Sequence, residues 1–77
     1  MIMTTTELEQ VIRTSICNTF KREYTGKIKI KKLDPIGYSV SLYPQGEYVP
    51  LVFDAELEDD LFIKYLIEDI RNRKFHL

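Results

Sequence analysis

Few residues of this chain have the chemistry of a catalytic centre. The single histidine, His76, is the penultimate of 77 residues, and the single cysteine, Cys17, falls at the edge of the apolar side of a predicted helix. One thiol and one imidazole do not supply the ligands that a zinc site requires. With no histidine predicted nearby to activate it, Cys17 is expected to be a small packing residue. We therefore predict no catalytic residue, no metal site, no cofactor and no small-molecule substrate, and thus a protein that is not an enzyme.

Carboxylates gather between Asp54 and Asp60, where five of the seven residues are acidic. This segment lacks the alternating ligands and the central glycine of a calcium-binding loop. Negative charge is favoured at the start of a helix by the helix dipole. We therefore expect the segment to begin a helix rather than to bind a metal ion.

Lysines alternate with isoleucines from Lys27 to Lys31, and Lys32 follows. Strict alternation is typical of a strand with one buried face, and the lysines would then line the other face. Lysines beside exposed tyrosines can hold a phosphate backbone and stack bases. Lysines also protect an edge strand against aggregation, which is the other interpretation. The residues of the possible nucleic-acid site are Lys27, Lys29, Lys31, Lys32, Tyr43 and Tyr48.

A second apolar stripe is predicted on the last helix, where Leu57, Leu61 and Tyr65 are spaced by four residues. This spacing puts them on one side of a helix, turned away from the arc that holds Phe62 and Ile67. The stripe is either covered within the chain, by the first helix or by Phe75 and Leu77, or exposed. An exposed apolar strip bordered by charge is typical of a protein interface. We predict that these three residues bind a protein partner or a second copy of the chain.

Two amphipathic helices are predicted to flank three strands. The first runs from about residue 4 to residue 24, with Thr4 and Glu7 as a capping box and Gly26 as the left-handed stop. The last runs from about residue 56 to residue 72, with Asp54 as its N-cap. Its expected core face is formed by Phe62, Ile63, Leu66, Ile67 and Ile70.

The strands are predicted from alternation at residues 27–31, 36–43 and 47–53, with turns at Asp34-Pro35 and Pro44-Gln45-Gly46. Pro50 would lie inside the third strand, and proline cannot donate to a ladder, so this strand is expected at an edge. We predict an α+β fold: a two-layer α-β-β-β-α domain with a three-stranded antiparallel meander and both helices packed on one face.

The predicted order of elements resembles that of double-stranded-RNA-binding domains. Those domains hold phosphates with lysines at the start of the last helix, where this chain has Glu56-Leu57-Glu58-Asp59-Asp60. The resemblance is confined to the order of elements, and an acidic helix start would repel an RNA duplex. It therefore implies no duplex-binding activity for this chain.

The composition and the charge distribution indicate the class of protein, the number of domains and the compartment. The chain is 44% hydrophobic and 30% charged, which is typical of a globular domain, and we expect one domain over residues 1–77 with a frayed tail at 73–77. It has no apolar stretch long enough for a membrane span and no apparent signal peptide, so a cytoplasmic protein is expected. The net charge of −1 conceals a separation: residues 13–32 hold seven bases and one acid, whereas residues 34–70 hold nine acids and one base.

Overall fold

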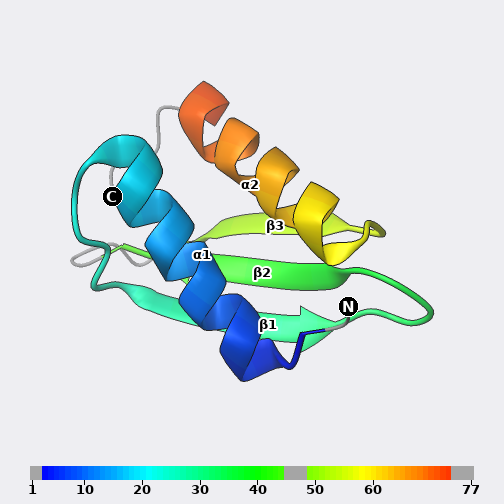
Figure 1. Ribbon diagram of the computed structural model, residues 1–77. Coiled ribbons are helices and arrows are strands. Elements are labelled where there is room, and N and C mark those ends of the chain that lie inside the picture. The colour runs from blue at the N-terminus through cyan, green and yellow to red at the C-terminus, as the bar shows by residue number, and fades with distance from the viewer. Residues whose placement is uncertain (1–2, 45–48, 74–77) are drawn as a thin grey trace.

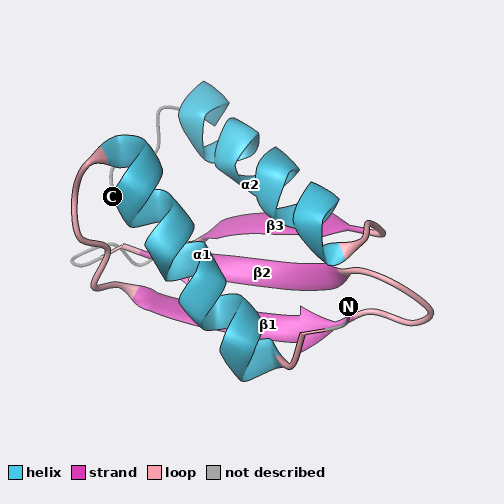
Figure 2. Ribbon diagram, in the orientation of Figure 1, coloured by secondary structure: helices cyan, strands magenta, loops and turns pink. Residues whose placement is uncertain are grey.

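The computed structural model describes residues 3–44 and 49–73, which form two layers. The elements are α1 (Thr5–Phe20), β1 (Lys27–Lys32), β2 (Tyr38–Tyr43), β3 (Leu51–Ala55) and α2 (Asp59–Arg73). Both helices cover the same face of the sheet, with α2 over β3 and α1 beside it (Figures 1 and 2). The predicted α+β class, the antiparallel meander and the packing of both helices on one face are confirmed.

The register of the sheet sorts its side chains between two faces. Ile28 pairs with Leu42, and Leu42 pairs with Leu51, so these three apolar side chains share the face beneath the helices. Lys29 pairs with Ser41, which is paired in turn with Val52 on the opposite face. Because neighbouring residues of a strand point to opposite faces, the sheet has one apolar side and one polar side.

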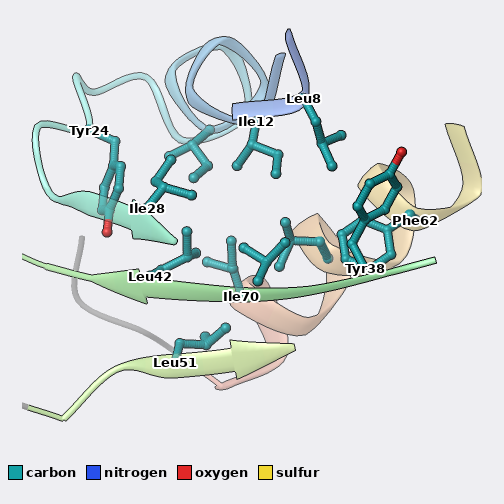
Figure 3. Close-up of a cluster of buried hydrophobic side chains, with 12 residues drawn as sticks. Leu8, Ile12, Tyr24, Ile28, Tyr38, Leu42, Leu51, Phe62 and Ile70 are labelled. Atoms are coloured by element: carbon teal, nitrogen blue, oxygen red, sulfur yellow. The ribbon is translucent and has the colours of Figure 1, made fainter. Parts of the chain in front are cut away.

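One apolar cluster joins the two layers (Figure 3). The ring of Phe62 meets the rings of Tyr38 and Phe53 edge-on, with centroids 5.4 Å and 5.2 Å away, so α2 is seated on β2 and β3. The expected core face of the last helix is confirmed, because Ile63 and Ile67 also pack against the cluster. The buried members of the cluster are Leu8, Ile12, Ile16, Tyr24, Ile28, Tyr38, Val40, Leu42, Leu51, Phe62, Leu66 and Ile70.

The start of α1 is as predicted, but its end is not. The hydroxyl of Thr4 accepts a hydrogen bond from the Glu7 N–H, and the Glu7 carboxylate accepts one from the Thr4 N–H, both at 3.1 Å. The helix ends at Phe20, and Lys21 takes the left-handed conformation at φ 57°. The expected continuation to Tyr24 is therefore wrong.

Tertiary contacts of Tyr24 explain the earlier end of α1. The ring of Tyr24 is buried beside Ile28 at the start of β1 (Figure 3). The Arg13 guanidinium donates hydrogen bonds to the carbonyls of Tyr24 and Gly26, at 3.1 Å and 2.8 Å. A Cβ on Gly26 would collide with the Tyr43 carbonyl oxygen, so Gly26 allows a close approach of the chain instead of stopping the helix.

The strands β2 and β3 begin later than predicted. Ile36 is 41% exposed in the connection before β2, which starts at Tyr38. Val49 and Pro50 precede β3, so the proline is not inside the strand. β3 is nevertheless an edge strand, because it is the last in the order β1-β2-β3. Gly46 and Tyr48 lie outside the described residues.

The last helix starts later than predicted, and Asp54 is not its N-cap. Asp54 and Ala55 pair with Ser39 and Tyr38, which extends β3 by two residues beyond the predicted strand. Residues 56–58 form the connection, and the helix begins at Asp59. Arg73, which we assigned to the tail, is the last residue of α2, and residues 74–77 lie outside the described part of the chain.

Gly37 is expected to be indispensable for stability. It has φ 99°, and a Cβ at this position would collide with the carbonyl oxygen of Ala55. Gly37→Ala is expected to lower the free energy of unfolding by about 1–3 kcal/mol, the usual cost of a strained backbone conformation. Urea unfolding measures this change. Gln10→Ala, at an exposed position of α1, is the control and is expected to stay within about 0.5 kcal/mol of the wild type. Equal losses in the two variants would refute the strain argument.

Stability is expected to fall in strong alkali because of Tyr24. Burial raises the pKa of Tyr24 to about 12 from an ordinary value of 10.0, although the Arg13 guanidinium opposes this shift. The unfolded chain therefore releases this proton first, and the stability that depends on neutral Tyr24 is complete below pH 10 and is lost as the pH rises towards 12. Urea unfolding between these pH values should show a smaller loss in Tyr24→Phe than in the wild type. Parallel losses would contradict this assignment.

Candidate functional site

The uncovered face of the sheet carries the lysines that the sequence singled out. Lys27, Lys29 and Lys31 are exposed and lie on the face opposite the helices, as predicted. They pair with Tyr43, Ser41 and Ser39 of β2, in that order. We call this surface the open face and define it by the three lysines, the three β2 partners, Val52 and Asp54.

Lys32 does not belong to the open face. It follows Lys31 directly, so the alternation of the strand turns it to the face that the helices cover. There it pairs with Tyr38 and lines a cavity at the end of the sheet. Lys32 is one of the predicted nucleic-acid-binding residues, but the structure does not bring it together with the other three lysines. Tyr48, the other aromatic residue predicted for the site, lies outside the described residues.

The open face changes in character from β1 to β3. Lysine ammonium groups line its β1 side, and the half-buried Ser39, Ser41 and Tyr43 form its centre. The ammonium of Lys29 lies 5.5 Å from the centroid of the Tyr43 ring, close enough for a cation–π contact. On β3 the face ends in the exposed Val52 and Asp54. The positive charge is therefore confined to one side of this surface.

Two of the three predicted interface residues lie exposed on α2. Leu61 and Tyr65 are 42% and 43% exposed. Leu57 lies in the connection before α2, where it packs against the core, so the prediction that it continues the helical stripe is wrong. The later start of the helix removes it from the stripe. Coverage by Phe75 and Leu77 concerns residues outside the described part of the chain.

Leu61 and Tyr65 lie on the flank of α2 that is turned away from α1. At about 100° per residue, they fall on one side of the Phe62–Ile70 ridge, and Ile63 and Ile67 fall on the other. The two isoleucines pack against the core that α1 shares, whereas Leu61 and Tyr65 are exposed. Since α2 lies over β3, the exposed flank lies on the side of the free edge of β3 (Figure 1). We call the free edge of β3 together with Leu61 and Tyr65 the β3–α2 side.

The two edges of the sheet differ in the side chains that protect them. Every exposed side chain of β1 is a lysine. The exposed side chains of β3 are Val52 and Asp54, of which only one is charged. Repeated lysines discourage pairing with another strand. The lysines of β1 therefore protect its edge against pairing with another strand, whereas the N–H and C=O groups at the edge of β3 are open to such pairing.

A polar cluster that the sequence did not predict joins three distant segments. The Asp59 carboxylate accepts hydrogen bonds from the Tyr38 hydroxyl and from the Met3 N–H, both at 2.9 Å. Burial, followed by the Asp59 carboxylate, raises the pKa of the Tyr38 hydroxyl. A cavity of about 500 Å³ lies beside the cluster, lined in part by Lys32 and Ile36. No local pattern signals this contact, because Met3 and Asp59 are 56 residues apart.

The described residues contain no group of three or more histidine, cysteine, aspartate or glutamate side chains arranged to hold a metal ion. Cys17 is half-buried on α1. His76 lies outside the described part of the chain. Within residues 3–44 and 49–73, no helix has the length and apolar character needed to cross a membrane.

No family model, no curated protein and no solved structure matches this chain.

The hydrogen bond between Tyr38 and Asp59 is expected to stabilise the fold. Tyr38→Phe removes the hydroxyl that donates to the Asp59 carboxylate. The free energy of unfolding should fall by about 1.5–3 kcal/mol, the usual range for a hydrogen bond to a charged group. Tyr65→Phe, at an exposed position, is the matched control and should change stability by less than about 0.5 kcal/mol. Thermal or urea unfolding measures both. A loss for Tyr38→Phe no larger than for the control would argue against a stabilising role for this bond.

Proposed function

We propose that this protein is a small non-enzymatic domain that acts through protein–protein contacts. Its partner is a second copy of the same chain, bound through the β3–α2 side. The observation that carries the proposal is the difference between the two sheet edges: β1 is guarded by lysines and β3 is not. We propose the cytoplasm as the compartment, since a chain with one cysteine cannot form an internal disulfide.

Antiparallel pairing of two β3 strands about a two-fold axis satisfies the backbone groups at both free edges. Such an interface is self-complementary, which is the commonest form of symmetric dimer. If the two-fold axis passes beside Phe53, each Phe53 lies opposite the Phe53 of the second copy. Val52 then lies opposite Asp54 of the second copy. The two Asp54 carboxylates therefore do not face each other, and like-charge repulsion across the pair is avoided.

The flank of α2 adds apolar contact to this pairing. Leu61 and Tyr65 lie on the side of the β3 edge, so a two-fold axis at that edge brings the same two side chains of the second copy towards them. Each exposes more than two fifths of its surface in the single chain. A domain of this size has a small core and gains stability from a partner subunit.

The mass of the protein in solution tests this proposal. Sedimentation or light scattering over a wide concentration range should show a monomer–dimer equilibrium. Leu61→Glu places a charge in the contact and should raise the dissociation constant by at least about tenfold, corresponding to about 1.4 kcal/mol. Ile36→Glu is the matched control, since Ile36 is 41% exposed but lies in the connection between β1 and β2, and should leave the equilibrium unchanged.

A second measurement checks the role of the strand itself. Amide hydrogen exchange of residues 51–55 should slow as the concentration rises, because dimerisation would cover the free edge of β3. A monomer at every accessible concentration would refute the proposal. A dimer that Leu61→Glu leaves intact would refute the assignment to this side of the molecule.

A further inference from the structure

We propose that the open face of the sheet binds single-stranded nucleic acid, with phosphates along β1 and bases over β2 and β3. The open face meets the β3–α2 side at β3 but uses the outward side chains of the sheet rather than the edge of the strand, and the inference does not depend on dimerisation.

Positive charge is spaced regularly along β1. Lys27, Lys29 and Lys31 are exposed, and alternate residues of a strand lie about 6.6 Å apart on the same face. Three lysines that extend from alternate positions of one strand suit a polymer with regularly repeated negative charges. A single small anion would engage only one or two of them.

The row of residues beside the lysines has the chemistry to contact phosphates and bases. The paired positions on β2, about 4.8 Å away, hold Ser41, Ser39 and the ring of Tyr43. Serine hydroxyls donate to phosphates and exchange hydrogen bonds with base edges, and a tyrosine ring provides a surface on which a base stacks. The contact of Lys29 with the Tyr43 ring keeps a charge next to that stacking surface. Protection of an edge strand requires charge alone and does not account for this second row.

The open face suits single-stranded rather than double-stranded nucleic acid. Asp54 is exposed on the β3 side of the open face and pairs with Ser39, which pairs in turn with Lys31. The carboxylate therefore lies two strand spacings, or about 10 Å, from the lysine row and repels a second phosphate backbone. The face is the surface of a sheet, whereas duplex grooves are commonly read by a helix or a ribbon that enters them. One backbone fits this arrangement and two do not.

Fluorescence anisotropy with a labelled oligothymidylate of about 15 nucleotides tests the inference. The logarithm of the binding constant should fall with the logarithm of salt concentration with a slope of about −2, since three phosphate contacts contribute about 0.7 each on single strands. Lys29→Ala should reduce the steepness by about 0.7 and weaken binding. Lys64→Ala is the matched control, because Lys64 also lies over a tyrosine ring, at 5.8 Å, but belongs to α2.

Variants at Tyr43 separate stacking from attraction by charge alone. Tyr43→Leu should weaken binding by about 5- to 150-fold, the range that alanine substitution gives for base stacking. Tyr43→Phe retains the ring and should bind as the wild type does, which also controls for an effect on folding.

Three results would overturn the inference: no binding at low salt, equal binding constants for Lys29→Ala and Lys64→Ala, or equal affinity for a duplex of the same length. Competition by polyglutamate as effective as competition by unlabelled oligonucleotide, with no effect of Tyr43→Leu, would also refute it and would assign the face to acidic polymers in general. The mass of each sample, measured in parallel, reports dimerisation separately, so either proposal can fail without the other.

Discussion

The structure depends on one constraint: two helices cover only one face of a three-stranded sheet. The central strand β2 provides this face with Tyr38, Val40 and Leu42, all almost fully buried. Phe62 of α2 packs against Tyr38 and against Phe53 of β3, so one aromatic ring positions α2 over its two strands. The burial of these side chains is the main favourable contribution to folding.

The one-sided core leaves two surfaces with different properties. The opposite face of the sheet holds the charged and hydroxyl side chains that alternate with the core residues, because the strand period places them there. The side of α2 away from α1 holds Leu61 and Tyr65 next to the β3 edge. The lysines of β1 guard the other edge and also contribute the charge of the open face. The two proposals therefore use different parts of β3: dimerisation uses the N–H and C=O groups of its edge, and nucleic-acid binding uses the side chains of its uncovered face.

Local patterns predicted the kinds of element better than their limits. The capping box set the start of α1, and the arc from Phe62 to Ile70 was predicted as the core face of α2. The ends depend on contacts between segments. Tyr24 leaves the helix because its ring is buried beside Ile28 and Arg13 binds the carbonyls of the following connection. Asp54 belongs to β3 because it pairs with Ser39, although its sequence context resembles a helix cap.

The sequence by itself determined that Lys27, Lys29 and Lys31 share one face and that Leu61 and Tyr65 share one flank. Each depends on the period of a single element, which the order of residues contains completely. Only the tertiary structure decided that Leu57 packs against the core and that Asp59 joins Tyr38 to Met3. These facts depend on where an element ends and on which distant segment lies beside it. The packing of the whole domain determines the end of each element and its neighbours, and the residue pattern within one element does not reveal either.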